Sequence, residues 1–225
     1  MAAADSAAPV CIVVGMGDSL GAALVRRFAT GGGKVAFTGR RAAALAEHEA
    51  RLRADGYDVR GFAADAADRD AMADVVARIT QTWGHPEVLI YNAAVMQQGE
   101  LGLAELADAR LSFEANALGA LNAAQLVRPG MRQAGGGTIL ISGGAAAIAP
   151  HPGWGILALG KAALRSITLS LAHELKPDGI RVSSVVIYGS IQYDPFYAPD
   201  AIAQRFWELY QTPGTELPAE VDFRP

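Results

Sequence analysis

The stretch that decides the fold is VCIVVGMGDSLGAALVRRFATGGG, residues 10–33. Its first five residues are apolar and mostly β-branched, which is typical of a strand buried on both faces. A glycine-rich turn follows, and residues 19–33 then show the helical period and a glycine stop. A buried strand that passes through such a turn into a helix predicts an alternating α/β fold with a phosphate-binding turn near its start.

The same alternation continues along the chain. It predicts further strands at 34–38, 59–64, 87–93, 137–142 and 180–187, and helices at 40–56, 68–84, 105–135, 155–175 and 200–211. We expect a kink near Pro129 in the longest of these helices. Six apolar strands separated by helices indicate one doubly wound parallel sheet, a single Rossmann-type domain over 9–225. Residues 216–225 either add a short edge strand or lie over the surface.

Composition excludes several classes of protein. The 225 residues are 51% hydrophobic and carry a net charge of -4, so nothing favours a nucleic-acid or membrane-surface partner. Cys11 is the single cysteine, which indicates a reducing compartment and hence the cytoplasm. Residues 1–8 lack the features of a signal peptide and are expected to form a loose tail. The four histidines are scattered, so no metal site is expected.

The glycine turn carries the first predicted site. Gly15, Gly17 and Gly21 permit a tight turn, a close backbone approach to a pyrophosphate and close packing of the helix. The N–H groups at the helix start, at Ser19 and Leu20, would then face the phosphates. The alternative interpretation is a plain turn between a strand and a helix.

The end of the second strand indicates which dinucleotide binds. A protein that binds NAD usually has an acidic residue here for the ribose 2′-hydroxyl, but this chain has Gly39 followed by Arg40 and Arg41. Arginine grips a phosphate through two parallel hydrogen bonds, so the pair predicts a 2′-phosphate and therefore NADP. The alternative is that the two arginines simply begin a solvated helix.

Several motifs, in order, resemble the short-chain dehydrogenase/reductase family over almost the whole chain. The glycine turn resembles the family's G-x-x-x-G-x-G pattern, with Ser19 in place of the middle glycine. AADAAD (63–68) resembles the segment in which Asp65 and the backbone of Ala66 would hold the adenine. LIYNAA (89–94) resembles the family's Asn-Asn-Ala-Gly, which implies that Asn92, Ala93 and Ala94 lie beside the cofactor.

Two further motifs complete the resemblance. SFEANALGA (112–120) is similar to the helix that carries the family's active-site asparagine, here Asn116. KAALRSITLSLAHELKPDGIRV (161–182) is similar to the family's fifth helix and sixth strand. The resemblance implies that Lys161 binds the nicotinamide ribose, and that Asn116 supports a bound water and a bend in its helix. It also places Gly189 and Ile191 beside the nicotinamide. The alternative for Lys161 is a side chain that reaches solvent from the helix.

The resemblance breaks at the residues that would touch the substrate. The family uses serine, tyrosine and lysine, with the tyrosine four residues before the lysine. Here Leu157 takes the tyrosine position and Gly144 takes the serine position. Ser142 could serve only if the local register shifted. Leucine has no proton to give, and general acid catalysis is worth about 10²–10⁴ in rate.

Other side chains could donate the missing proton. His151 lies in the loop before the lysine helix, and Tyr188 follows the sixth strand. Tyr193 and Asp194 lie in the loop that the family closes over substrate. For each of these residues, the competing interpretation is loop packing or a solvated side chain.

These observations lead to two hypotheses of different classes. The first is an NADP-dependent oxidoreductase that acts on a small, apolar carbonyl, alcohol or alkene with a non-standard proton donor. The second is a catalytically silent NADP-binding sensor or interaction protein. The resemblance also implies a homodimer formed through the helices that carry Asn116 and Lys161, although core burial explains their apolar residues nearly as well.

Overall fold

The computed structural model describes residues 8–191 and 193–225, so residues 1–7 of the predicted tail lie outside the described residues. Within these ranges seven strands form one sheet in the order β3-β2-β1-β4-β5-β6-β7, and all neighbours pair in parallel. The predicted doubly wound α/β fold is confirmed. The strands are β1 (Val10–Val14), β2 (Lys34–Gly39), β3 (Val59–Ala63), β4 (Val88–Tyr91), β5 (Gly137–Gly144), β6 (Ile180–Ile187) and β7 (Glu220–Phe223).

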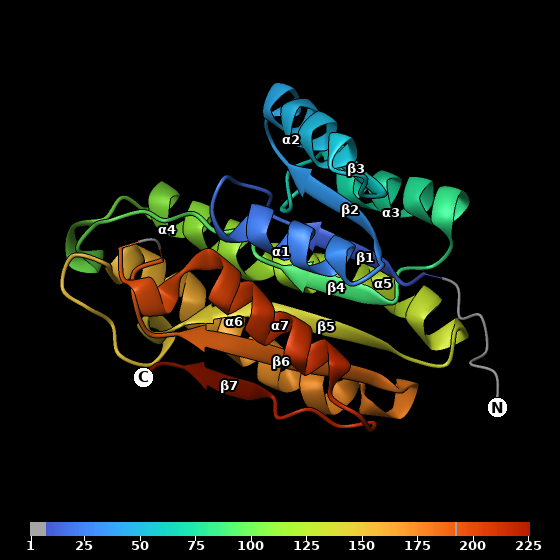
Figure 1. Cartoon of the computed structure of the whole chain (residues 1–225). Helices are drawn as coiled ribbons and strands as arrows, with labels where there is room; N and C mark the ends of the chain where they lie inside the picture. The colour runs from blue at the N-terminus through green and yellow to red at the C-terminus, as the bar shows by residue number, and fades with distance from the viewer. Residues whose placement is uncertain (1–7, 192) are drawn as a thin grey trace.

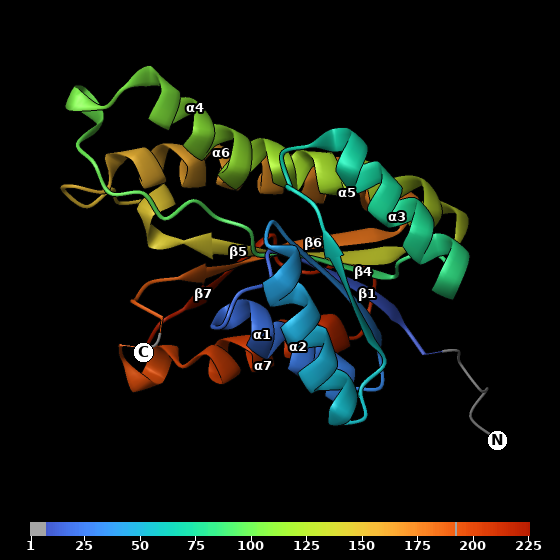
Figure 2. The same ribbon diagram turned by 90° about the horizontal axis from the view of Figure 1, so that it is seen from above.

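Helices cover both faces of the sheet (Figures 1 and 2). One layer contains α3 (Arg69–Trp83), α4 (Leu106–Phe113), α5 (Gly119–Gln133) and α6 (Gly155–Glu174). The other contains α1 (Leu20–Thr30), α2 (Ala42–Ala54) and α7 (Pro199–Gln211). Alternate residues of each strand face the two layers: Ile12 packs in one core and Val13 in the other. The strands are therefore apolar throughout, as the sequence indicated.

The C-terminal tail forms an edge strand. β7 pairs in parallel with β6, from Ser184 opposite Glu220 to Ile187 opposite Phe223. Its Glu220 carboxylate accepts two hydrogen bonds of 2.7 Å from Arg165 of α6. Of the two alternatives for residues 216–225, the strand is the one that forms.

The helix expected at 105–135 is divided by a π-helical turn, and Pro129 lies inside its last part. α5 runs through Pro129 to Gln133, and the irregular segment is a π-helical turn at Glu114–Leu118. Pro129 and Gln125, whose carbonyl loses its helical partner, are both exposed, so water can satisfy that carbonyl. The π turn contains Asn116, a fully buried amide that exchanges hydrogen bonds with the backbone of Val95, outside the helix.

α6 is the one helix in the described ranges that is long and apolar enough, by length and composition, to cross a membrane. In this fold it packs against β5, β6 and α4, and Leu164 and Leu171 are buried in the core. A central core helix passes the same test, so its hydropathy is explained by burial against the sheet.

Candidate functional site

The glycine turn between β1 and α1 is built by close backbone contacts. Gly15 has φ of +101°, and a Cβ there would overlap the backbone nitrogen of Ala93. A Cβ on Gly21 would lie 2.6 Å from the carbonyl oxygen of Gly15. Both positions therefore require glycine, one for its left-handed backbone and its contact with the β4 loop, the other for close helix packing. Gly17 has open space beside it, so the protein itself does not require a glycine there.

The turn presents a row of unbonded N–H groups. The N–H groups of Gly15 and Met16 donate to the carbonyl of Thr38, and that of Ala22 donates to Gly17. In the part of the chain that the structure covers, the N–H groups from Gly17 to Gly21 have no protein acceptor. The Ser19 side chain also makes no capping bond. Such consecutive free donors at a helix start form a site for an anion such as a pyrophosphate.

A chain of hydrogen bonds links this turn to Lys161 across three neighbouring strands. The Nδ2 atom of Asn92 donates to the Gly15 carbonyl at 2.9 Å, and its Oδ1 accepts from Ser142 Oγ at 2.9 Å. The Ser142 carbonyl in turn accepts from Lys161 Nζ at 2.9 Å. The sequence predicted Asn92 and Lys161 separately and considered Ser142 only as a substitute for the missing serine. It missed the position of Ser142 between Asn92 and Lys161, for which a polar residue near the end of an apolar strand was the available signal.

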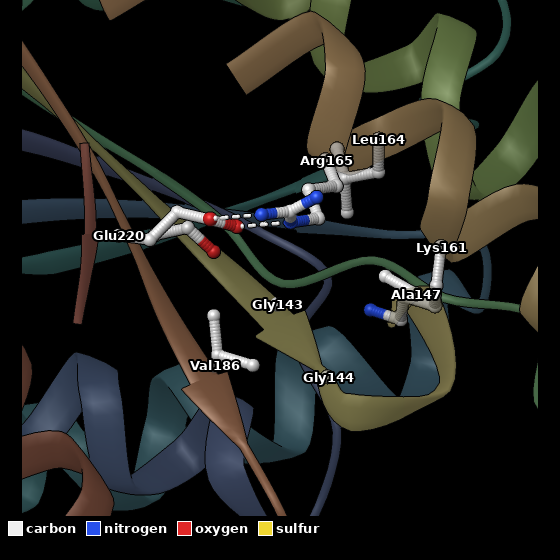
Figure 3. Close-up of a pocket in the computed structure, with 9 residues that line it drawn as sticks. Gly143, Gly144, Ala147, Lys161, Leu164, Arg165, Val186 and Glu220 are labelled. Atoms are coloured by element: carbon white, nitrogen blue, oxygen red, sulfur yellow. Dashed lines mark hydrogen bonds and ion pairs between the residues drawn. The ribbon is translucent and has the colours of Figure 1, made fainter. Parts of the chain in front are cut away.

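Lys161 is held deep in the fold, with 8% of its surface exposed. Burial away from water lowers the pKa of its ammonium group from 10.5 to about 8. Its side chain lines a small cavity of about 10 Å³ together with Gly143, Gly144 and Ser184, and the Arg165–Glu220 ion pair lies at the same cavity (Figure 3). That volume corresponds to about one water molecule, and the ammonium group has two donors beyond the Ser142 bond.

The lowered pKa predicts how stability depends on pH. Lys161 binds its proton more weakly in the folded protein, so in the cofactor-free wild type its contribution to the free energy of unfolding rises between about pH 8 and 10.5. In Lys161→Met this rise is absent. The stability of the variant relative to wild type should therefore fall by about 3 kcal/mol across that window. Urea unfolding at several pH values measures the difference, with Lys34→Met, at a partly exposed position, as control; parallel pH curves for wild type and Lys161→Met would contradict the assignment.

Asn116 links the loop after β4 to α4 and α6 through hydrogen bonds. Its Oδ1 accepts from the Val95 N–H at 2.9 Å, and its Nδ2 donates to Ser112 Oγ at 2.9 Å. Ser112 Oγ donates to the Ile156 carbonyl at 2.7 Å. A Cβ on Gly160 would lie 2.8 Å from the Asn116 Cβ, so α6 packs very closely here, one residue before Lys161. Asn116 thus sets the position of the lysine helix relative to the β4 loop.

Leu157 and Gly144 lie where the motif spacing predicted. Leu157 is buried one helical turn before Lys161 on α6. Gly144 ends β5, and a Cβ there would meet only the Ile187 carbonyl, at 3.9 Å. β5 keeps a continuous register with β6 through Ser142, Gly143 and Gly144. Ser142 Oγ is directed to Asn92.

The candidate proton donors are placed differently from one another. His151 is exposed, and its Nδ1 lies 2.9 Å from the carbonyl of the next residue. Tyr188 is half-buried beside β7, under the Arg224 guanidinium, and its pKa is raised by loss of hydration first and by Asp222 second. Neither forms a hydrogen bond with Lys161 in residues 8–191 and 193–225.

The loop after β6 carries the remaining predicted residues. Tyr193 and Asp194 are exposed, and the Asp194 carboxylate caps the short helix Pro195–Tyr197 by accepting from the Phe196 N–H. Gly189 packs against the Tyr197 ring, where a Cβ would overlap it, and Ile191 packs at the edge of the same core.

The residues predicted for the adenosine end lie after β2 and β3. Arg40 and Arg41 are exposed at the start of α2, and Gly39 packs against Leu45. Asp65 is exposed, and its carboxylate accepts from the Ala67 N–H at 3.0 Å; Ala66 is buried. No group of three or more His, Cys, Asp or Glu side chains is arranged to hold a metal ion in the described ranges.

Comparison with known proteins identifies the family. The family described as short chain dehydrogenase matches residues 9–191. The chain belongs to the short-chain dehydrogenase family. Among its relatives, human dehydrogenase/reductase SDR family member 4 is 30% identical over 181 residues, which are 77% of this chain and 63% of that protein. The chain therefore spans somewhat less than two thirds of this relative. The 2,3-dihydro-2,3-dihydroxybenzoate dehydrogenase of Bacillus subtilis is 28% identical, over 82% of this chain and 70% of that one.

Solved structures of other short-chain dehydrogenases have the same fold. A short-chain dehydrogenase from Rhodopseudomonas palustris superposes with a TM-score of 0.87 at 26% identity, over 96% of this chain and 98% of that one. A metagenomic short-chain oxidoreductase in complex with NADP superposes with a TM-score of 0.88 at 26% identity, over 97% of each chain. These superpositions cover a larger share of the chain than the family match over residues 9–191.

Proposed function

We propose that this short-chain dehydrogenase is an NADP-dependent oxidoreductase that acts on a small, apolar carbonyl, alcohol or alkene through a non-standard proton donor. The observation that carries the proposal is the row of free N–H groups from Gly17 to Gly21, beside a hydrogen-bonded route to the buried Lys161. When bound, the dinucleotide supplies or accepts the hydride.

The residues present fit such a dinucleotide. The free N–H groups would bind the pyrophosphate, and the open space beside Gly17 leaves room for its approach. Asp65 and the backbone of Ala66 would hold the adenine, and the loop of Asn92, Ala93 and Ala94 would lie along the nicotinamide half with Gly189 and Ile191. The unused donors of Lys161 would bind the ribose hydroxyls.

Preference for the phosphorylated dinucleotide rests on Arg40 and Arg41. Both are exposed at the end of β2, and neither forms an ion pair among the described residues. We expect Arg40→Ala to weaken NADPH binding about tenfold while NADH binding stays within about twofold, because a charge-assisted bond to the 2′-phosphate is lost. Fluorescence titration of both nucleotides measures this, with Arg53→Ala near the end of α2 as control; equal weakening of the two nucleotides would remove the 2′-phosphate argument. The neighbouring short-chain oxidoreductase solved with NADP is consistent with this preference.

An apolar substrate is supported by the side chains around Leu157. The loop of residues 95–105 is tied to the turn before α6 by hydrogen bonds between Gly99 and Gly153 and between Gly155 and Gly99. It carries exposed Met96 and Leu101. Exposed apolar side chains on this loop favour a ligand with little polar surface.

The second candidate function is an NADP-binding protein without turnover. It is favoured by Leu157 and Gly144, which leave no hydroxyl at the two positions that the family uses for its substrate oxygen. NADPH consumption over a panel of carbonyls and enones separates the two functions. Turnover of any panel member supports the enzyme, whereas micromolar NADPH binding without turnover supports the silent protein. His151→Gln and Tyr188→Phe then test the two candidate donors in whichever reaction is found.

We also propose that the protein forms a homodimer in the cytoplasm. Apolar side chains are exposed just before α4, on α4 and in the π turn, namely Leu103, Leu106, Phe113 and Leu118. Pairing through α4, α5 and α6 would cover them. The cytoplasmic location rests on Cys11, a free thiol buried in β1.

A further inference from the structure

A second polar network lies beside the glycine turn, outside the chain that leads to Lys161. A groove of about 510 Å³ runs between α1 and α2 and is lined by Met16, Asp18, Arg26, His48 and Arg51 among others. His48 is buried in it with 7% of its surface exposed, whereas His85, His151 and His173 are exposed. A buried imidazole needs polar partners on its ring nitrogens.

Both ring nitrogens of His48 have a partner. Nδ1 lies 2.9 Å from Arg51 Nη2, and Nε2 lies 3.1 Å from Asp18 Oδ1. A guanidinium only donates, so Nδ1 must accept and the ring proton must be on Nε2, which faces the carboxylate. The three side chains therefore form a chain of hydrogen bonds in which Arg51 donates to His48 and His48 donates to Asp18.

Asp18 belongs to the segment whose N–H groups are free. It stands between Gly17 and Ser19, and neither the Ser19 side chain nor any other acceptor in the described chain bonds the N–H groups of this segment. Gly15 and Gly17, which precede Asp18, give the backbone of the turn wide conformational freedom. A carboxylate next to an anion site is electrostatically unfavourable for an anion. The Arg51 charge offsets this effect, and the contact with His48 fixes the turn to α2.

We propose that His48 is a positioning residue for the cofactor turn: with Arg51 it holds Asp18, and through Asp18 it keeps the N–H groups of Gly17–Gly21 in the arrangement that binds a pyrophosphate. The proposal rests on the proposed dinucleotide-binding function. It predicts equal effects on NADPH and NADH, because the two nucleotides share the pyrophosphate.

Matched replacements test each contact. His48→Leu fills the same space without a donor, and we expect NADPH and NADH to bind about tenfold more weakly. His48→Gln keeps a donor toward Asp18 and should bind within about threefold of wild type. Asp18→Ala should resemble His48→Leu, and the double variant should be no weaker than either alone. Asp18→Asn keeps the acceptor for His48 but removes the carboxylate charge beside the anion site, so both nucleotides should bind at least as tightly as to wild type. His173→Leu, at the exposed end of α6, is the control.

Two measurements on the cofactor-free protein separate positioning from general stability. The ¹⁵N shifts of the His48 ring should show the proton on Nε2, and Arg51→Met should remove that preference. Backbone ¹⁵N order parameters of residues 17–21 should fall in His48→Leu but not in His48→Gln or His173→Leu. A uniform fall over the whole chain would mark loss of stability and overturn the positioning role.

The outcomes distinguish this proposal from the proposed function. Wild type that binds neither nucleotide overturns the proposed function, and the order parameters still decide whether His48 holds the turn. If wild type and His48→Leu bind the nucleotides equally well, the positioning role alone is overturned. A loss confined to NADPH would assign His48 to the 2′-phosphate and also overturn it.

Discussion

Restoring the two hydroxyl groups, by Leu157→Tyr together with Gly144→Ser, is expected to raise NADPH-dependent carbonyl reduction by about 10²–10⁴, the usual contribution of a general acid. Leu157 is one helical turn from Lys161, so a tyrosine there would lie beside the ammonium group that acidifies it. Gly144 has space for a side chain, since a Cβ meets its nearest neighbour at 3.9 Å. The rate of NADPH oxidation with a panel of small ketones measures the gain.

Two control variants separate the effect of the tyrosine hydroxyl from that of its ring. Leu157→Phe with Gly144→Ser has the same ring without the hydroxyl and should show no gain, and Lys161→Met in the tyrosine background should lose it. Equal rates for the Tyr and Phe variants would show that the site lacks something other than an acid. A wild type already as fast as the Tyr variant would show that another donor is at work.

The second large effect is expected at Gly15. Gly15→Val should abolish dinucleotide binding, with a loss of roughly 100-fold or more, because any side chain at φ of +101° is strained and would overlap Ala93. The turn can then no longer pack against the β4 loop, and the Asn92 contact with the Gly15 carbonyl is lost with it. The free energy of unfolding should fall by about 3 kcal/mol or more. Calorimetric titration and urea unfolding measure the two losses.

Gly17→Ala is the matched control for the loss of stability. Gly17 is in the same turn, but a Cβ there would have no atom within 4 Å, and its backbone has no unusual requirement. The free energy of unfolding of this variant should stay within about 0.5 kcal/mol of wild type. A fall in nucleotide affinity at unchanged stability would mean that the ligand approaches the turn from that open side. Wild-type affinity in Gly15→Val would remove the glycine turn from the binding site.

The sheet could be predicted from the sequence because its strands are buried on both faces. Runs such as 10–14 and 180–187 are apolar throughout, and the helices between them are long and periodic. Helix ends were less accurate: the helix expected at 19–33 ends at Thr30, since three glycines already form the turn. The edge strand was ambiguous because β7 has only four residues and alternates charged with apolar side chains.

The residues of the site could be predicted from the sequence, but the hydrogen bonds among them could not. Asn92, Asn116 and Lys161 follow from motif spacing, but the bonds among Lys161, Ser142 and Asn92 depend on how three parallel strands align. The π turn depends on the contacts of Asn116 with residues far away in the sequence, so there was no local signal for it in the sequence. His48 and Asp18 are 30 positions apart, and neither shows a pattern that would pair them.

β7 has a consequence for how the protein behaves in concentrated solution. A sheet edge exposes unpaired N–H and C=O groups that can recruit another chain and start aggregation. Here the edge is only Glu220–Phe223, and it carries carboxylates at Glu220 and Asp222, the first of them turned inward onto Arg165. A short, acidic edge of this kind is a poor template for a foreign strand. The Glu220 and Asp222 carboxylates therefore also disfavour the addition of another chain at the β7 edge.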